Sequence, residues 1–208
     1  MRVRDLITGR DFSTKIEDAK GDIAWANDGK TLFYTMLDDN HRPFRVMRHT
    51  VNMEQKSDDL IYEEADPGFF VSLDKCQSGQ FIIISAHDHT TSEIHLIDAN
   101  DPHSPPEIVT PRKVNIEYSV APIGEKLLIL TNADDAEDFK IVETPLSNPN
   151  RENWKDVVPH EPGRLIRTIL EFANHLVRLE RVDGLPKIII REIISGAEHT
   201  VEFDEDVY

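Results

Sequence analysis

The chain has 208 residues, of which 39% are hydrophobic, so it can bury a substantial core. No stretch approaches the roughly 18 consecutive apolar residues of a membrane helix, and we expect a soluble protein with no membrane partner. The 23 basic and 39 acidic residues give a formal net charge of −16, a field that repels phosphate backbones and attracts cations. Nucleic acid is therefore not expected as a partner.

The N-terminal segment and the cysteine content bear on the compartment. Residues 1–12 contain no apolar core or small-residue cleavage site, so export is not indicated. The single cysteine, Cys76, cannot form an internal disulfide, which fits a reducing compartment. We therefore expect a cytoplasmic protein in which Cys76 is a half-buried strand residue.

Short apolar segments separated by turn residues predict an all-β chain with few or no helices. Residues 1–17 hold two short segments, Arg2 to Leu6 and Phe12 to Ile16, which we interpret as the outer strands of a preceding blade. On this interpretation the chain begins in the middle of a blade.

Four groups of four strands are predicted to follow, forming blades at residues 21–63, 68–110, 115–158 and 163–204. The second strand of the first blade, TLFYTML, alternates poorly, which is typical of a strand buried on both faces. The predicted strands are 22–25, 31–37, 44–49 and 59–63; 69–74, 80–87, 93–98 and 107–110; 116–121, 126–132, 139–145 and 154–157; 164–172, 175–182, 185–193 and 198–203.

A turn recurs between the first and second strands of each predicted blade, at Gly29, Gly79, Gly124 and Asn174. Glycine and asparagine tolerate the positive φ that a tight hairpin requires. Spacings of 45 to 50 residues fall in the range of four-stranded propeller blades. The sequence thus favours a partial β-propeller spanning residues 1–208, with a β-sandwich as the alternative.

Sequence motifs for catalysis and cofactor binding are missing. No G-x-S-x-G string marks a nucleophilic serine, and Ser78 and Ser195 lie in predicted turns, which indicates structural roles. Neither a phosphate-binding loop nor a dinucleotide fingerprint occurs. The sequence therefore predicts no catalytic residue and no cofactor.

Two kinds of cluster could bind a metal ion. His87, His89 and His95 could ligate zinc, but we favour solvated loop histidines because the spacing is weak evidence. The loop of Asp134, Asp135, Glu137 and Asp138 lacks the EF-hand pattern, so we favour an exposed hairpin tip over a calcium site. The polar loop of Asp38, Asp39, His41 and Arg42 is interpreted in the same way, and no metal site is predicted.

The two tryptophans could stack on a ligand or fill the core. Trp25 and Trp154 lie in or beside predicted strands with apolar neighbours, and we favour a core position for both. The S-x-D-x-G-x-T-W box of sialidase-type propellers is not reproduced.

Several segments of the sequence resemble those of a known protein family. RVRDLITG, DIAWANDGKTLFYTMLD, DDLIYEE, TSEIHLIDA and GRLIRTILEFANHLVRLE resemble, in order and spacing, the propeller of the prolyl oligopeptidase family of serine peptidases, specifically its oligopeptidase B (protease II) branch. The likeness covers nearly the whole chain.

The resemblance implies that this chain is part of a cap over a catalytic domain. In that family a seven-bladed propeller covers an α/β-hydrolase domain that holds the Ser, Asp and His of the triad, and it limits access to short peptides. About four blades and none of the hydrolase are present here, so no catalytic residue can be carried over. The implied partners are the missing hydrolase domain, the remaining blades and short cationic peptides, because the oligopeptidase B branch cleaves after Arg or Lys.

A freestanding repeat scaffold that binds other proteins stays open as an alternative. Either way, blades without neighbours expose apolar faces, so we expect the chain to self-associate.

Overall fold

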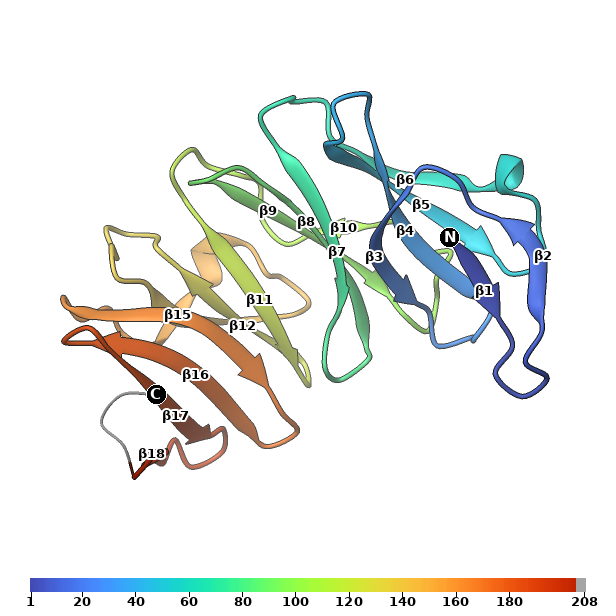
Figure 1. Cartoon of the computed structure of the whole chain (residues 1–208). Helices are drawn as coiled ribbons and strands as arrows, with labels where there is room; N and C mark the ends of the chain where they lie inside the picture. Colours follow the sequence, from blue (N-terminus) through green and yellow to red (C-terminus); the bar gives the residue numbers. More distant parts are fainter. Residues whose placement is uncertain (205–208) are drawn as a thin grey trace. The chain divides into compact units, whose positions relative to one another are not determined.

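The structure is a computed structural model that describes residues 1–204, and it is an all-β architecture (Figure 1). No α-helix occurs among these residues, and two short 3-10 segments, Gln55–Ser57 and Arg151–Asn153, lie in loops. The predicted domain extends to residue 208, and its last four residues, 205–208, lie outside the described residues.

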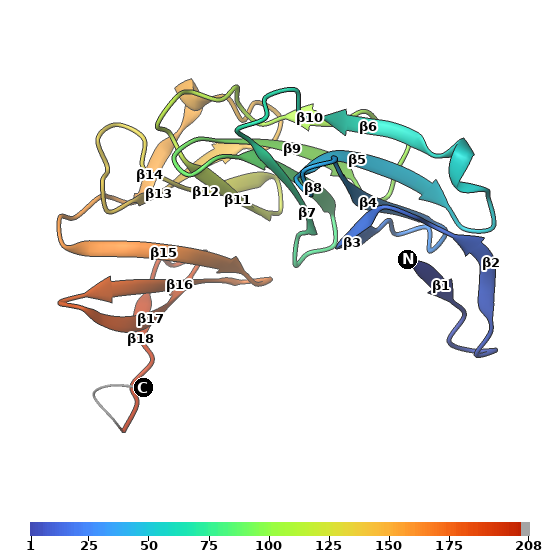
Figure 2. The ribbon, with the colours of Figure 1, turned by 45° about the horizontal axis from the view of Figure 1, so that its top comes forward.

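Every strand pairs antiparallel with its neighbour in sequence, within one two-stranded sheet and four four-stranded sheets (Figure 2). The strands are β1 Arg2–Arg4 and β2 Asp11–Lys15; β3 Ala19–Trp25, β4 Thr31–Leu37, β5 Pro43–Thr50 and β6 Asp59–Glu63 in the first four-stranded sheet; β7 Phe70–Lys75, β8 Phe81–His87, β9 Ser92–Asp98 and β10 Glu107–Ile108 in the second; β11 Tyr118–Ile123, β12 Lys126–Thr131, β13 Lys140–Pro145 and β14 Lys155–Val158 in the third; β15 Arg164–Glu171, β16 His175–Val182, β17 Leu185–Glu192 and β18 Glu198–Thr200 in the fourth.

The predicted pattern of four four-stranded antiparallel sheets after two outer strands is confirmed. Two outermost strands are shorter than expected: β10 contains two residues where four were predicted, and β18 contains three where six were predicted. Pro105, Pro106 and Pro111 flank β10 and lack the backbone N–H that a longer ladder needs.

The chain forms two compact units. The first contains Met1–His89 and Glu93–Val109, and the second contains Thr90–Ser92 and the chain from Thr110 onward.

In the first unit, the second strand of the first four-stranded sheet is buried on both faces. Phe33 packs with Val71 and Ile82 of the second sheet, while Tyr34 packs with Ile16 beside the two-stranded sheet. Both aromatic side chains are fully buried, as the poor alternation of TLFYTML predicts. The sheets of this unit therefore stack face to face.

The second unit is built in the same way. Leu128 and Leu130 of β12 pack with Ile166 and Ile169 of β15 and with Leu176 of β16. A continuous apolar core thus joins the third and fourth sheets.

The repeated turns are confirmed at three of four positions. Gly29, Gly79 and Gly124 have φ of 65°, 72° and 57°. The prediction for Asn174 is wrong, because this residue is not in the positive-φ region; Phe172 and His175 close that hairpin through backbone hydrogen bonds in both directions.

The core prediction for Trp25 is also wrong, since its side chain is 37% exposed. Trp25 and Ile23 lie opposite Leu32 and Tyr34 in the β3–β4 register. The core cluster that includes Ile16 covers Leu32 and Tyr34 but leaves these two β3 residues uncovered. Burial of a sheet face requires a full facing sheet, and β1 and β2 cover only part of it.

Candidate functional site

The loops of each four-stranded sheet leave from two opposite ends of its strands. Loops between the second and third strands, and loops that lead from one sheet to the next, leave from the same strand ends, which we call the connecting edge. Loops between the first and second strands and between the third and fourth strands leave the opposite edge, the turn edge. Every sheet therefore begins and ends at its connecting edge.

Carboxylates are concentrated in the connecting-edge loops. These loops hold Arg42, Arg112 and Lys113 as their lysines and arginines, whereas the turn-edge loops hold Arg10, Lys30, Lys56 and Arg151. Of the turn-edge cations, Arg151 reaches Asp134 of a connecting-edge loop with its side chain. The acids of the turn edge are Asp5, Asp28, Glu54, Asp58, Asp101, Glu125 and Glu152. The acids of the connecting edge are Glu17, Asp18, Asp38, Asp39, Glu64, Asp66, Asp88, Glu117, Asp134, Asp135, Glu137, Asp138, Glu161 and Asp183.

Some of these acids shape the connecting edge of the first unit. Asp38 accepts hydrogen bonds from the backbone N–H groups of Asn40 and Arg42, and its other oxygen lies 2.9 Å from Arg42 Nε. The backbone bond from Arg42 is the main reason that the pKa of Asp38 is lowered. Arg42 also donates to the backbone oxygens of Asp66 and Phe69, which ties two loops together.

The acidic loop of the second unit is likewise partly structural. Asp134 is paired with Arg151 at 2.8 Å and with Lys140 at 3.2 Å, and the hydrogen bond from Arg151 is the main cause of its lowered pKa. Asp138 accepts a hydrogen bond of 2.7 Å from the backbone N–H of Gly163. These contacts connect the loop to the next sheet.

Other acids of the connecting edge carry their charge into solvent. Asp39, Asp135 and Asp183 are exposed. Asp135 and Asp183 have φ of 60° and 52°, as residues at hairpin tips often do. Their carboxylates are therefore available to act on a ligand at long range.

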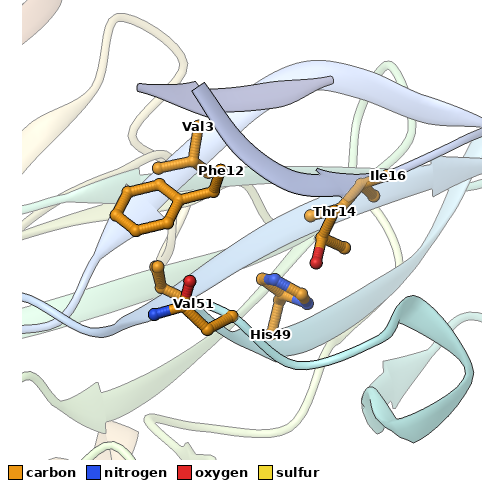
Figure 3. A pocket seen from close by; sticks show the side chains of 7 residues that line it. Val3, Phe12, Thr14, Ile16, His49 and Val51 are labelled. Atoms are coloured by element: carbon orange, nitrogen blue, oxygen red, sulfur yellow. The ribbon is translucent and has the colours of Figure 1, made fainter. Parts of the chain in front are cut away.

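A buried polar network lies beneath the two-stranded sheet. His49 Nδ1 is 2.7 Å from Asp58 Oδ1, and Tyr34 donates to the other Asp58 oxygen at 2.9 Å. Burial is the main cause of the raised pKa of Tyr34. Figure 3 shows Val3, Phe12, Thr14 and Ile16 on one side of a hollow and His49 and Val51 on the other. This hollow has no volume for a water molecule. The network is therefore structural.

The predicted metal candidates do not converge. His95 Nε2 lies 3.3 Å from Glu93 and its ring packs on Tyr62, whereas His87 Nδ1 lies 3.2 Å from the Asp88 backbone oxygen. Within residues 1–204, no three His, Cys, Asp or Glu side chains form a group that could hold a metal ion.

The serines and the cysteine lie in turns. Ser78 Oγ is 3.2 Å from Cys76 Sγ, and Ser195 donates a hydrogen bond to Glu192. Cys76 is more buried than the predicted half-buried position, and its sulfur accepts a hydrogen bond from the Phe81 N–H at 3.2 Å. All three groups serve local structure.

Trp154 is half-buried, its indole N–H donates to the Pro149 backbone oxygen, and its ring packs edge-on against Tyr118 with centroids 5.9 Å apart. It is thus part of the packing, partly as predicted.

No helix of the described chain is both long and apolar enough to cross a membrane.

A charged network in the fourth sheet was not predicted from the sequence. Arg178 and Glu180 of β16 are 4% exposed and 2.6 Å apart, and Arg178 also pairs with Glu198 at 2.8 Å. Arg178 shares a face of the strand with Leu176, which belongs to the core. The alternation in HLVRLERV, with charges at inward positions, was the available signal.

All of residues 1–208 match the family described as "Prolyl oligopeptidase, N-terminal beta-propeller domain". The chain belongs to the prolyl oligopeptidase family. It is 33% identical over 208 residues to "Protease 2" of Moraxella lacunata, covering 99% of this chain. It is 30% identical over 209 residues to "Dipeptidyl aminopeptidase BI" of Pseudoxanthomonas mexicana, covering 100% of this chain. The chain spans 29% of the length of each relative.

Solved structures of prolyl oligopeptidase family members agree. Oligopeptidase B from Leishmania major superposes with a TM-score of 0.91 at 27% identity, over 97% of this chain and 30% of that one. Oligopeptidase B from Trypanosoma brucei superposes with a TM-score of 0.87 at 30% identity, over 91% of this chain and 28% of that one. The four-stranded sheets are therefore propeller blades, and the chain is a portion of the family's N-terminal propeller.

Proposed function

We propose that this chain is the non-catalytic part of a serine oligopeptidase, in which it limits and steers the access of short peptides to an α/β-hydrolase domain. Family membership is the observation that carries the proposal. The contacts of Ser78 with Cys76 and of Ser195 with Glu192 support it, because neither serine is paired with a histidine base in the described chain. On this proposal every catalytic residue lies outside the chain.

The topology supports a specific orientation of the cap. Each blade begins and ends at its connecting edge, so any whole number of blades enters and leaves the propeller on that side. The linkers to a following or preceding domain would then lie there, and short linkers would place the hydrolase against the connecting edge. We assign this edge to the side of the reaction centre.

The charge distribution supports steering on the same side. Acidic loops at the connecting edge, among them those with Asp39, Asp135 and Asp183, would raise the local concentration of cationic peptides near the active site. This would suit the preference for Arg or Lys that the resemblance to the oligopeptidase B branch implies for the whole protein. Exclusion of larger substrates would come from the blades themselves.

We further propose that residues 1–208 form one partial propeller domain with blades at 21–63, 68–110, 115–158 and 163–204. The lone cysteine supports a cytoplasmic location for the whole protein. Its remaining blades and its hydrolase domain would be the permanent partners of this chain.

An assay of the purified chain tests the non-catalytic role. With an arginyl chromogenic peptide we expect no turnover above background, and the same background with a serine-directed inhibitor, because the described residues contain no paired nucleophile and base. Inhibitor-sensitive hydrolysis that stays with the chain through further purification would refute the proposal.

A further inference from the structure

A cavity in the second unit is lined by charges of both signs and by apolar side chains. Its volume is about 270 Å³, near the lower end of ligand pockets. It lies between the third and fourth sheets, whose side chains Leu128 and Leu176 form part of its lining. The complete lining is Leu128, Glu143, Asp156, Val157, Leu176, Arg191 and Ile193.

The cationic group of this cavity is held in place. Arg191 Nη1 donates to Glu198 Oε1 at 2.7 Å, and Glu198 is in turn fixed by Arg178. A Cβ atom at Gly196 would lie 3.1 Å from Arg191 Nη2, so glycine at this turn leaves room for the guanidinium. The position of the guanidinium is thereby set before any ligand arrives.

The anionic groups are partly exposed. Glu143 pairs with Lys126 at 2.9 Å and Asp156 pairs with Lys140 at 3.0 Å. The Lys126 side chain is 59% exposed, and such solvent-exposed ion pairs contribute little stability, so a ligand cation could replace it. The cavity can therefore accept positive charge as well as one carboxylate.

We propose that this cavity binds a small cationic amino acid zwitterion, namely free arginine or lysine or a very short peptide that ends in one. The ligand carboxylate would pair with Arg191, its cationic groups with Glu143 and Asp156, and its methylene chain would lie on the half-buried side chains Val157 and Ile193. This assignment does not require the chain to be part of a peptidase.

Calorimetric titration of the 208-residue chain with L-arginine tests the assignment. We expect saturable binding that weakens at least tenfold for L-argininamide, which lacks the carboxylate, and at least tenfold in Glu143→Gln. Arg191→Ala should abolish binding. Matched controls are Arg181→Ala and Glu125→Gln, two exposed positions outside the cavity, and they should leave the affinity unchanged.

Circular dichroism of each variant separates lost binding from lost structure. If Arg191→Ala unfolds because Glu198 loses a partner, the Glu143→Gln and argininamide measurements decide. Absence of saturable binding, or binding that neither Glu143→Gln nor loss of the ligand carboxylate weakens, would overturn the proposal.

Discussion

At the scale of single residues, the fold depends on backbone positions that only a few residue types can occupy. Gly29 has φ of 65° in the first hairpin, and no atom would contact a Cβ added there. Any penalty for a side chain at this position therefore comes from backbone conformation alone.

Replacing Gly29 by alanine should lower the free energy of unfolding by about 1 kcal/mol, because a left-handed conformation is strained for alanine. Urea unfolding measures this change. The matched control is Gly21→Ala, where φ is not positive and space is also open, so alanine should be neutral or stabilising. Equal destabilisation of both variants would contradict the account.

Glu198 gives a pH-dependent contribution to stability. Hydrogen bonds from Arg178, followed by those from Arg191, lower its pKa to about 2. Because the folded pKa is below the unfolded value of 4.5, the stabilisation is present above pH 4.5 and is lost as the pH falls towards 2.

Glu198→Gln should therefore reduce the free energy of unfolding at pH 7 by about 1–2 kcal/mol, after allowance for solvent screening. The difference from the parent chain should shrink as the pH falls from 4.5 towards 2. Thermal unfolding at a series of pH values measures it, and a difference that does not change with pH would contradict the role of this carboxylate.

At the scale of strands and sheets, the stacked blades depend on strands buried on both faces. Phe33 is fully buried between the first and second sheets, whereas Leu60 of the outer strand β6 is 52% exposed. Truncation should therefore have very different effects at these two positions.

Phe33→Ala should destabilise the chain by about 3–5 kcal/mol through loss of buried surface and creation of a cavity. Leu60→Ala, the control in the same sheet, should change stability by less than about 1 kcal/mol. Chemical denaturation of both variants gives the comparison. Similar losses would mean that the sheets do not pack through β4.

Element type and order were predictable from sequence because turn glycines and apolar runs are local signals. Gly29, Gly79 and Gly124 fixed the first hairpin of three blades. The prediction for Asn174 failed because the hairpin between Phe172 and His175 closes without positive φ at this residue. In the same sheet, the Asp183–Gly184 turn, with φ of 52° and 83°, is the hairpin that has the expected positive φ.

Features that depend on neighbouring sheets were not predictable. Trp25 is apolar and lies in a strand, yet its exposure is decided by how far β1 and β2 extend over the same face. The inward charges Arg178 and Glu180 had a local signal in the alternation of β16, but their pairing with Glu198 on β18 joins strands two hairpins apart and could not be predicted from spacing. The concentration of acids in the connecting-edge loops of the individual sheets emerged only from strand order.

At the scale of the whole molecule, one face of the fourth sheet is expected to drive self-association of the chain. Leu170 on β15 is 45% exposed and lies opposite Val177 in the β15–β16 register, away from the apolar core that contains Leu176. Exposed apolar sheet faces bind one another.

Light scattering should therefore detect oligomers at high protein concentration, and Leu170→Lys should shift the chain towards the monomer. Ile194→Lys is the matched control, because it removes an apolar side chain from an isolated loop position that is 89% exposed. A monomer at all concentrations would contradict this expectation.

The central claim is that the connecting edge steers cationic peptides towards a reaction centre outside this chain. In the whole protein that we propose to be a peptidase, the triple variant Asp39→Asn, Asp135→Asn and Asp183→Asn removes three exposed charges from the connecting-edge loops with little change in side-chain shape. The control triple variant Asp101→Asn, Glu125→Gln and Glu152→Gln removes three exposed charges from the turn edge.

The decisive measurement is kcat/KM for a short arginyl peptide at increasing ionic strength. The account predicts a several-fold lower value for the connecting-edge variant at low salt, convergence with the parent at high salt, and little effect of the turn-edge variant. Equal effects of the two triple variants, or no effect of the first, would contradict it.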